Sequence, residues 1–183
     1  MRTLLLALLL LPSLASAVEI IASGVTQENS TYTLYIYARI DAPLPMVHAT
    51  ITDFANLAAI NPSIEESQVL IEAPDQQRVR TVVSVCILIF CKRVVQVQDV
   101  RKPDVHTIEA TMVPGAGDFR SGSARWTLQA QDGTTRLRFI EVFEPDFWVP
   151  PLIGPWMIED KLVEEVELTA RYIEQQARGV VSD

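Results

Sequence analysis

A long amphipathic segment at residues 156–177 constrains the fold most, because a series of short alternating segments precedes it. Its apolar residues recur at helical spacing and form one stripe. The stripe consists of Ile158, Leu162, Val166, Ala170 and Ile173, whereas Glu159, Asp160, Lys161, Glu164, Glu165 and Glu167 are expected to face mostly outward. A helix of this kind has to bury its apolar stripe against another element. We therefore expect it to lie across a sheet formed by the preceding segments.

The preceding segments alternate apolar and polar residues with the period of two that is typical of β-strands. In 32–40, for example, Leu34, Ile36, Ala38 and Ile40 share one face. Strands are expected at 18–25, 32–40, 68–72, 78–86, 91–100, 106–112, 123–130 and 136–143. Short polar turns join most of these segments, which predicts an antiparallel meander.

Two short helices are expected between the strand at 32–40 and the remaining strands. The first follows Asp41, which we expect to cap it, and has Pro43 and Pro45 in its first turn. The second is expected at 55–60 and ends at Asn61-Pro62, because the residue before a proline disfavours helical geometry.

Residues 1–17 are predicted to be a secretory signal peptide rather than part of the fold. Arg2 is followed by an apolar run from Leu4 to Leu11, and Ala15-Ser16-Ala17 has the small residues of a cleavage site. The run is too short for the roughly 20 apolar residues that cross a bilayer. We expect an exported protein, periplasmic if the source is bacterial and otherwise secreted.

Composition predicts one globular domain at 18–183 and excludes some functions. Apolar residues make up 49% of the chain, and its formal net charge of −8 argues against binding the nucleic-acid backbone. The two histidines, His48 and His106, lack the spacing of metal ligands or of a catalytic dyad. We therefore predict no catalytic residue, no metal and no cofactor.

Several residues around the two short helices resemble a known superfamily. They are Ala42-Pro43, Val47, Asp53-Phe54, Leu57 and Asn61-Pro62, with Gly122 and Arg125-Trp126 later in the chain. Together with the element order, they make the chain similar to the START-like (SRPBCC) superfamily, in its branch of polyketide cyclases/dehydrases and coenzyme Q-binding START-like proteins. His48 departs from the pattern, because an aromatic residue often follows the valine there.

The resemblance implies a helix-grip (START-like) fold of the α+β class. In this fold, a curved antiparallel sheet surrounds a long C-terminal helix, and two short helices follow the first long strand. The cavity between sheet and helix usually holds an apolar ligand. The fold itself implies no particular reaction, because one fold hosts many functions.

Glu141 is the carboxylate of most interest for such a cavity. It shares one face of its strand with Leu137, Phe139 and Phe143. If that face lines the cavity, burial raises the pKa of Glu141 and makes it a general acid or a polar anchor. The alternatives are a strand end near solvent or a partnership with Arg125. We predict that the ligand contacts Trp126, Phe139, Glu141, Phe143, Trp148 and Trp156.

Cys86 and Cys91 are predicted to form a disulfide in an exported protein. If Leu88-Ile89 is a two-residue hairpin turn, the two cysteines face each other across the strands. Leu-Ile lacks the glycine or asparagine that such turns prefer, so a wider four-residue loop is the alternative. Two free buried cysteines are the other alternative.

Two apolar loops, 87–90 and 147–156, are expected beside the mouth of the cavity. They either contact a membrane or a protein partner, or pack together and close the cavity end. Three functions follow from these features. We favour an exported protein that binds or carries a lipid, quinone or similar molecule. The alternatives are a cyclase/dehydrase-type enzyme acting on an apolar substrate and a protein-interaction module with a filled cavity.

Overall fold

A computed structural model describes residues 18–179, so the predicted signal peptide at 1–17 lies outside the described residues. The strands are β1 (Glu19–Glu28), β2 (Thr31–Ile40), β3 (Ile64–Glu72), β4 (Gln77–Ile87), β5 (Phe90–Asp104), β6 (Thr107–Met112), β7 (Phe119–Gln131) and β8 (Thr134–Pro145). The helices are α1 (Leu44–Ile51), α2 (Leu57–Ile60) and α3 (Pro155–Ala177).

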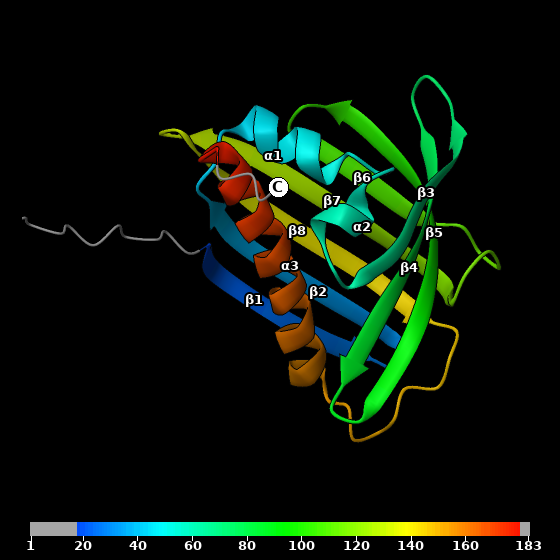
Figure 1. The fold of residues 1–183 in the computed structure, drawn as a ribbon. Coiled ribbons are helices and arrows are strands. Elements are labelled where there is room, and N and C mark those ends of the chain that lie inside the picture. Colours follow the sequence, from blue (N-terminus) through cyan, green and yellow to red (C-terminus); the bar gives the residue numbers. More distant parts are fainter. Residues whose placement is uncertain (1–17, 180–183) are drawn as a thin grey trace, which may run out of the picture.

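Within residues 18–179, the strands form one antiparallel sheet in the order β1-β2-β8-β7-β6-β5-β4-β3. The sheet is curved, and α3 lies across its concave side, while α1 lies beside the C-terminal end of α3 (Figure 1). β2 and β8 are neighbours in the sheet although β3 to β7 separate them in the chain, and the connection through α1 and α2 leads from β2 to β3 at the far edge. This arrangement is the helix-grip fold, and the predicted strands and helices are confirmed.

The alternation of β2 and β8 determines which side chains face α3. Leu34, Ile36 and Ala38 are fully buried, and the intervening residues of β2 are more exposed. In the antiparallel register, Leu34 lies opposite Glu141 and Ile36 lies opposite Phe139. The period of two therefore directs Glu141 toward the helix side of the sheet, as its strand pattern predicts.

The start of α1 differs from the expectation. Pro43 is the N-cap residue and the helix has no side-chain cap, so the prediction that Asp41 caps it is wrong. The backbone N–H of Asp41 instead donates to Glu174 of α3, at 2.9 Å. This bond satisfies the carboxylate of Glu174, which is buried at the C-terminal end of α3.

The stripe of α3 is buried unevenly along its length. Ala170 and Ile173 have no exposed surface, and they pack on Ile40 and Leu137 of the sheet. Leu162, nearer the N-terminal end, is only half-buried. Two of the charged residues expected to face mostly outward also turn toward the sheet. The side chains of Lys161 and Glu165 are only 19% and 18% exposed.

Candidate functional site

A cavity of about 480 Å³ lies beneath the N-terminal end of α3, and we call it the outer chamber. Its walls come from the β4–β5 hairpin, from β8 and from the segment between β8 and α3. The apolar wall residues include Val85, Ile87, Val94, Phe119, Phe143, Phe147, Ile153 and Ile158. A volume in this range suits a drug-sized or lipid-like molecule.

A second cavity of about 270 Å³, the inner chamber, lies under the middle and the C-terminal part of α3. Residues of α1, α2 and the middle of the sheet enclose it, among them Ile51, Leu57, Ile60, Val79, Val100 and Ile108. Trp126 and Phe139 form one wall and stack on each other, with ring centroids 4.8 Å apart. Both chambers beneath α3 are therefore lined mainly by apolar side chains.

The residues proposed to contact the ligand are divided between the two chambers. Phe143 and Trp148 line the outer chamber, whereas Trp126 and Phe139 line the inner one. Glu141 lines both chambers. Trp156 lines neither and is exposed at the start of α3. Their contact with a ligand stays a prediction.

Glu141 lies on an apolar strand face that lines the chambers, which is the condition under which the sequence analysis expects a raised pKa. Its exposed surface faces the chambers, and the surrounding protein shields it from bulk solvent. Burial raises the pKa of the Glu141 carboxyl from 4.5 to about 7. Arg125, the alternative partner, instead forms an ion pair with Glu109 at 2.5 Å. Glu141 is therefore protonated in a large fraction of molecules near neutral pH.

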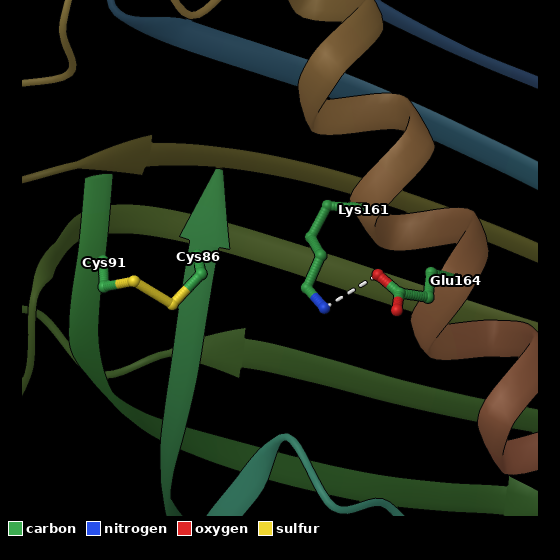
Figure 2. Close-up of a disulfide and its surroundings, with 4 residues drawn as sticks. All are labelled: Cys86, Cys91, Lys161 and Glu164. Atoms are coloured by element: carbon green, nitrogen blue, oxygen red, sulfur yellow. Dashed lines mark hydrogen bonds and ion pairs between the residues drawn. A yellow bond between two sulfur atoms is a disulfide. The ribbon is translucent and has the colours of Figure 1, made fainter. Parts of the chain in front are cut away.

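A charged pair on α3 also faces the outer chamber, and the sequence analysis missed it. Lys161 forms ion pairs with Glu165 at 2.8 Å and with Glu164 at 2.9 Å. Figure 2 shows Lys161 extending from α3 into the space beside the β4–β5 hairpin. Burial lowers the pKa of Lys161, but hydrogen bonds and charge from Glu165 and Glu164 outweigh it, so the net shift is upward.

The helical spacing contained a signal for this pair. Lys161 lies three residues after Ile158, and Glu165 lies three residues after Leu162, so both share a face with the apolar stripe. Ser63, which lies outside α3, also contacts this pair, because its hydroxyl donates to Glu165 at 2.7 Å. Only the tertiary contact shows that this face turns inward.

The disulfide between Cys86 and Cys91 is present at the tip of the β4–β5 hairpin (Figure 2). Ile87 pairs with Phe90, so the turn has two residues rather than four. Leu88 adopts a φ of 56°, the left-handed region that glycine and asparagine prefer. The disulfide joins the strands one residue pair before the turn, and it holds them together although Leu88-Ile89 is an unfavourable turn sequence.

Exposed apolar side chains surround the outer chamber, and we call them the rim. They are Leu88, Ile89, Phe90, Trp148, Leu152 and Trp156. Ile89 is 89% exposed and Leu152 is 79% exposed, although both are large hydrophobic residues. Figure 1 shows the β4–β5 turn and the segment before α3 side by side at this end of the molecule. The two apolar loops therefore leave much of their apolar surface uncovered.

The described part of the chain contains no helix that combines the length and the hydrophobicity needed to span a membrane.

Comparison with known families identifies the class of protein. Residues 32–174 match the family described as polyketide cyclase/dehydrase and lipid transport. The chain therefore belongs to this family, which confirms the START-like resemblance. A search of curated proteins found no match.

Solved structures with the same fold come from several bacteria. A START superfamily protein from Mycobacterium smegmatis has a TM-score of 0.61 at 20% identity, over 81% of this chain and 99% of the other. The aromatase/cyclase Zhui from Streptomyces has a TM-score of 0.63 at 16% identity, over 83% and 96%. A STAR-related lipid transfer protein fragment from Xanthomonas axonopodis has a TM-score of 0.60 at 13% identity, over 85% and 98%. At these identities the likeness establishes the fold.

Proposed function

We propose that this protein binds and carries an apolar small molecule, such as a lipid or a quinone, in the chambers beneath α3. The observation that carries the proposal is the apolar outer chamber of about 480 Å³, whose mouth is surrounded by the exposed rim. Removing apolar ligand surface from water contributes about 25 cal/mol per Å², so micromolar affinity needs few polar contacts.

The proposal includes export from the cytoplasm. A predicted signal peptide at 1–17 and a disulfide between Cys86 and Cys91 both fit an oxidising compartment. That compartment is the periplasm if the source is bacterial. Mass determination of the protein from its native host tests this, because retention of residues 1–17 would contradict export.

The rim supports a further part of the proposal, namely that the mouth contacts a membrane or a protein partner. Large exposed apolar patches mark such contact sites, and here the patch adjoins the route into the chamber. A ligand leaving a bilayer would then avoid bulk water.

A cyclase/dehydrase-type enzyme is the second candidate, and Glu141 favours it. A carboxyl with its pKa near 7 inside an apolar cavity is suited to general acid–base chemistry. A Glu141→Gln variant separates the two functions. It should abolish turnover if the protein is an enzyme, and it should leave the retention of bound lipid largely intact if it is a carrier. The interaction-module alternative required a cavity filled by side chains, whereas both chambers are open.

Native mass spectrometry of protein purified from its own compartment tests binding directly, with identification of the extracted ligand. A panel of fatty acids, quinones and sterols should give saturable quenching of tryptophan fluorescence. Val83→Phe, between the chambers, should weaken binding about tenfold, equivalent to about 1.4 kcal/mol. Val105→Phe is the matched control, because Val105 is exposed and lines neither chamber. No saturable response in the whole panel would overturn the proposal.

A further inference from the structure

The outer and inner chambers share a small set of lining residues, which we call the waist. The residues that line both chambers are Val83 of β4, Gln96 of β5, Glu141 of β8, and Leu162 and Glu165 of α3. The other lining residues on either side are predominantly apolar. In a ligand that occupies both chambers, the middle of the molecule, rather than an end, lies beside the polar groups of the waist.

The polar groups of the waist differ in how far their hydrogen-bonding capacity is used. The Oε1 atom of Glu165 accepts from the Ser63 hydroxyl and pairs with Lys161, so this carboxylate already has two partners. Glu141 makes no hydrogen bond or ion pair within residues 18–179. The Gln96 carbonyl lies 3.5 Å from the Thr81 hydroxyl, while its amide N–H groups have no partner within the same range. Glu141 and Gln96 thus retain the capacity to bind a ligand group.

The charges around the waist disfavour an ionic ligand group there. Besides Glu141, the titratable side chains that line the chambers are Tyr32 of β2, Lys92 of β5, and Lys161 and Glu165 of α3. The cations have carboxylate partners, since Lys161 pairs with Glu165, and Lys92 lies 3.9 Å from Asp118. An anion at the waist would meet Glu165, and an ammonium would have to lose its hydration in an apolar cavity.

A neutral acceptor fits the same groups better. The amide of Gln96 donates N–H groups, and Glu141 donates an O–H group when it is protonated. The two donors line the waist from different strands, β5 and β8, so they offer hydrogen bonds to an acceptor group from two sides of the cavity. An acceptor there would satisfy groups that are otherwise shielded from bulk water and lack partners.

We propose that the waist is a subsite for an uncharged hydrogen-bond acceptor, such as a ketone or ester carbonyl, in the interior of an apolar ligand whose two arms occupy the two chambers. This inference rests on the proposed function, because it names the ligand class of the same cavity. It adds a position along the ligand and a donor pair, Gln96 and Glu141. A ligand with its polar group at one end would leave one chamber without an apolar arm.

The experiment compares four straight-chain probes of equal length: an alkane, its mid-chain ketone, the terminal methyl ketone and a mid-chain amine. Displacement of a fluorescent fatty acid from the purified protein measures each affinity. The mid-chain ketone should bind about tenfold more tightly than the alkane, as one to two well-placed hydrogen bonds allow. The terminal methyl ketone should gain much less.

Variants then assign the preference to the waist. Glu141→Leu and Gln96→Leu should each reduce the ketone preference while the alkane still binds. Glu141→Gln should retain it, because an amide also donates. In the wild type the preference should fall as the pH rises through about 7, where Glu141 ionises and stops donating. In Glu141→Gln it should not change with pH.

Each outcome decides between the two proposals. A ketone preference that is equal in the wild type, Glu141→Leu and Gln96→Leu would overturn the waist subsite while leaving apolar binding intact. Equal binding of the two ketones, or tighter binding of the amine, would do the same. Saturable binding of none of the probes would overturn both proposals. Thermal unfolding of each variant verifies that it folds before its affinities are compared.

Discussion

The apolar stripe of α3 is fully buried near the C-terminal end of the helix, whereas it is only half-buried near the N-terminal end. Ala170 and Ile173 have no exposed surface and line the inner chamber, but Ile158 and Leu162 are half-buried and line the outer chamber. The same stripe thus faces a chamber at both ends, and only the degree of burial differs. An apolar stripe predicts burial, but it does not specify whether side chains of the sheet fill the space that the stripe faces or leave a chamber there.

The sheet accounts for the difference between the two halves. Near the C-terminal end, Ala170 and Ile173 belong to a cluster of buried side chains with Ile40, Val47, Leu128 and Leu137. Near the N-terminal end, residues of the β4–β5 hairpin and of the segment before α3 line the outer chamber, and several of them are exposed. Truncation in the fully buried half of the stripe should therefore cost more stability than truncation in the half-buried half.

The largest stability effect is expected in the fully buried half of the α3 stripe. Ile173→Ala should lower the free energy of unfolding by about 2–5 kcal/mol, because it removes a completely buried side chain from an apolar cluster. Ile158→Ala is the matched control on the same helix, and its loss should be less than about 2 kcal/mol. Urea unfolding measures both. Equal losses would contradict the division of the α3 stripe into a fully buried and a half-buried half.

The next effect comes from the titration of Glu141. Its pKa is raised from 4.5 to about 7, so its contribution to stability is full below pH 4.5 and is lost as the pH rises through 7. The wild type should lose about 1–3 kcal/mol relative to Glu141→Gln between pH 5 and pH 8. Urea unfolding at both pH values measures this difference. Parallel pH profiles would contradict the cavity environment of Glu141.

A smaller effect is expected from the disulfide at the mouth. Replacing Cys86 and Cys91 together by serine should lower the free energy of unfolding by less than about 2 kcal/mol, because the closed loop is short. Hydrogen exchange should increase mainly in the β4–β5 hairpin. A loss of protection throughout the sheet would show that the link stabilises the whole fold instead.

The smallest stability effect is expected at the rim. Ile89→Ser should change the free energy of unfolding by no more than about 0.5 kcal/mol, because the side chain is 89% exposed. The same variant should weaken sedimentation with phosphatidylcholine vesicles if the rim contacts a lipid surface. Val105→Ser is the control for a distant exposed valine. Unchanged sedimentation of the Ile89 variant would argue for a protein partner or for no contact.

Local patterns were sufficient to predict the sheet and the long helix, and they also placed Glu141 on the same strand face as Leu137, Phe139 and Phe143. Strand and helix periodicities are short-range properties, so the alternation within β2 alone predicts that Leu34 and Ile36 lie on the same face. The cap of α1 was not predictable in this way. Asp41 is a favourable cap residue by type, but α1 begins at Leu44 with Pro43 as its N-cap, so Asp41 lies two residues before the cap position.

The sequence by itself determined the order of elements, the face of each strand and the proximity of the two cysteines, because neighbouring residues set these features. Only the tertiary structure decided that Gln96, Glu141 and Glu165 meet at one waist. They come from β5, β8 and α3, and no local period relates them. Their meeting depends on how strongly the sheet curves and where α3 crosses it, which are properties of the packed molecule as a whole.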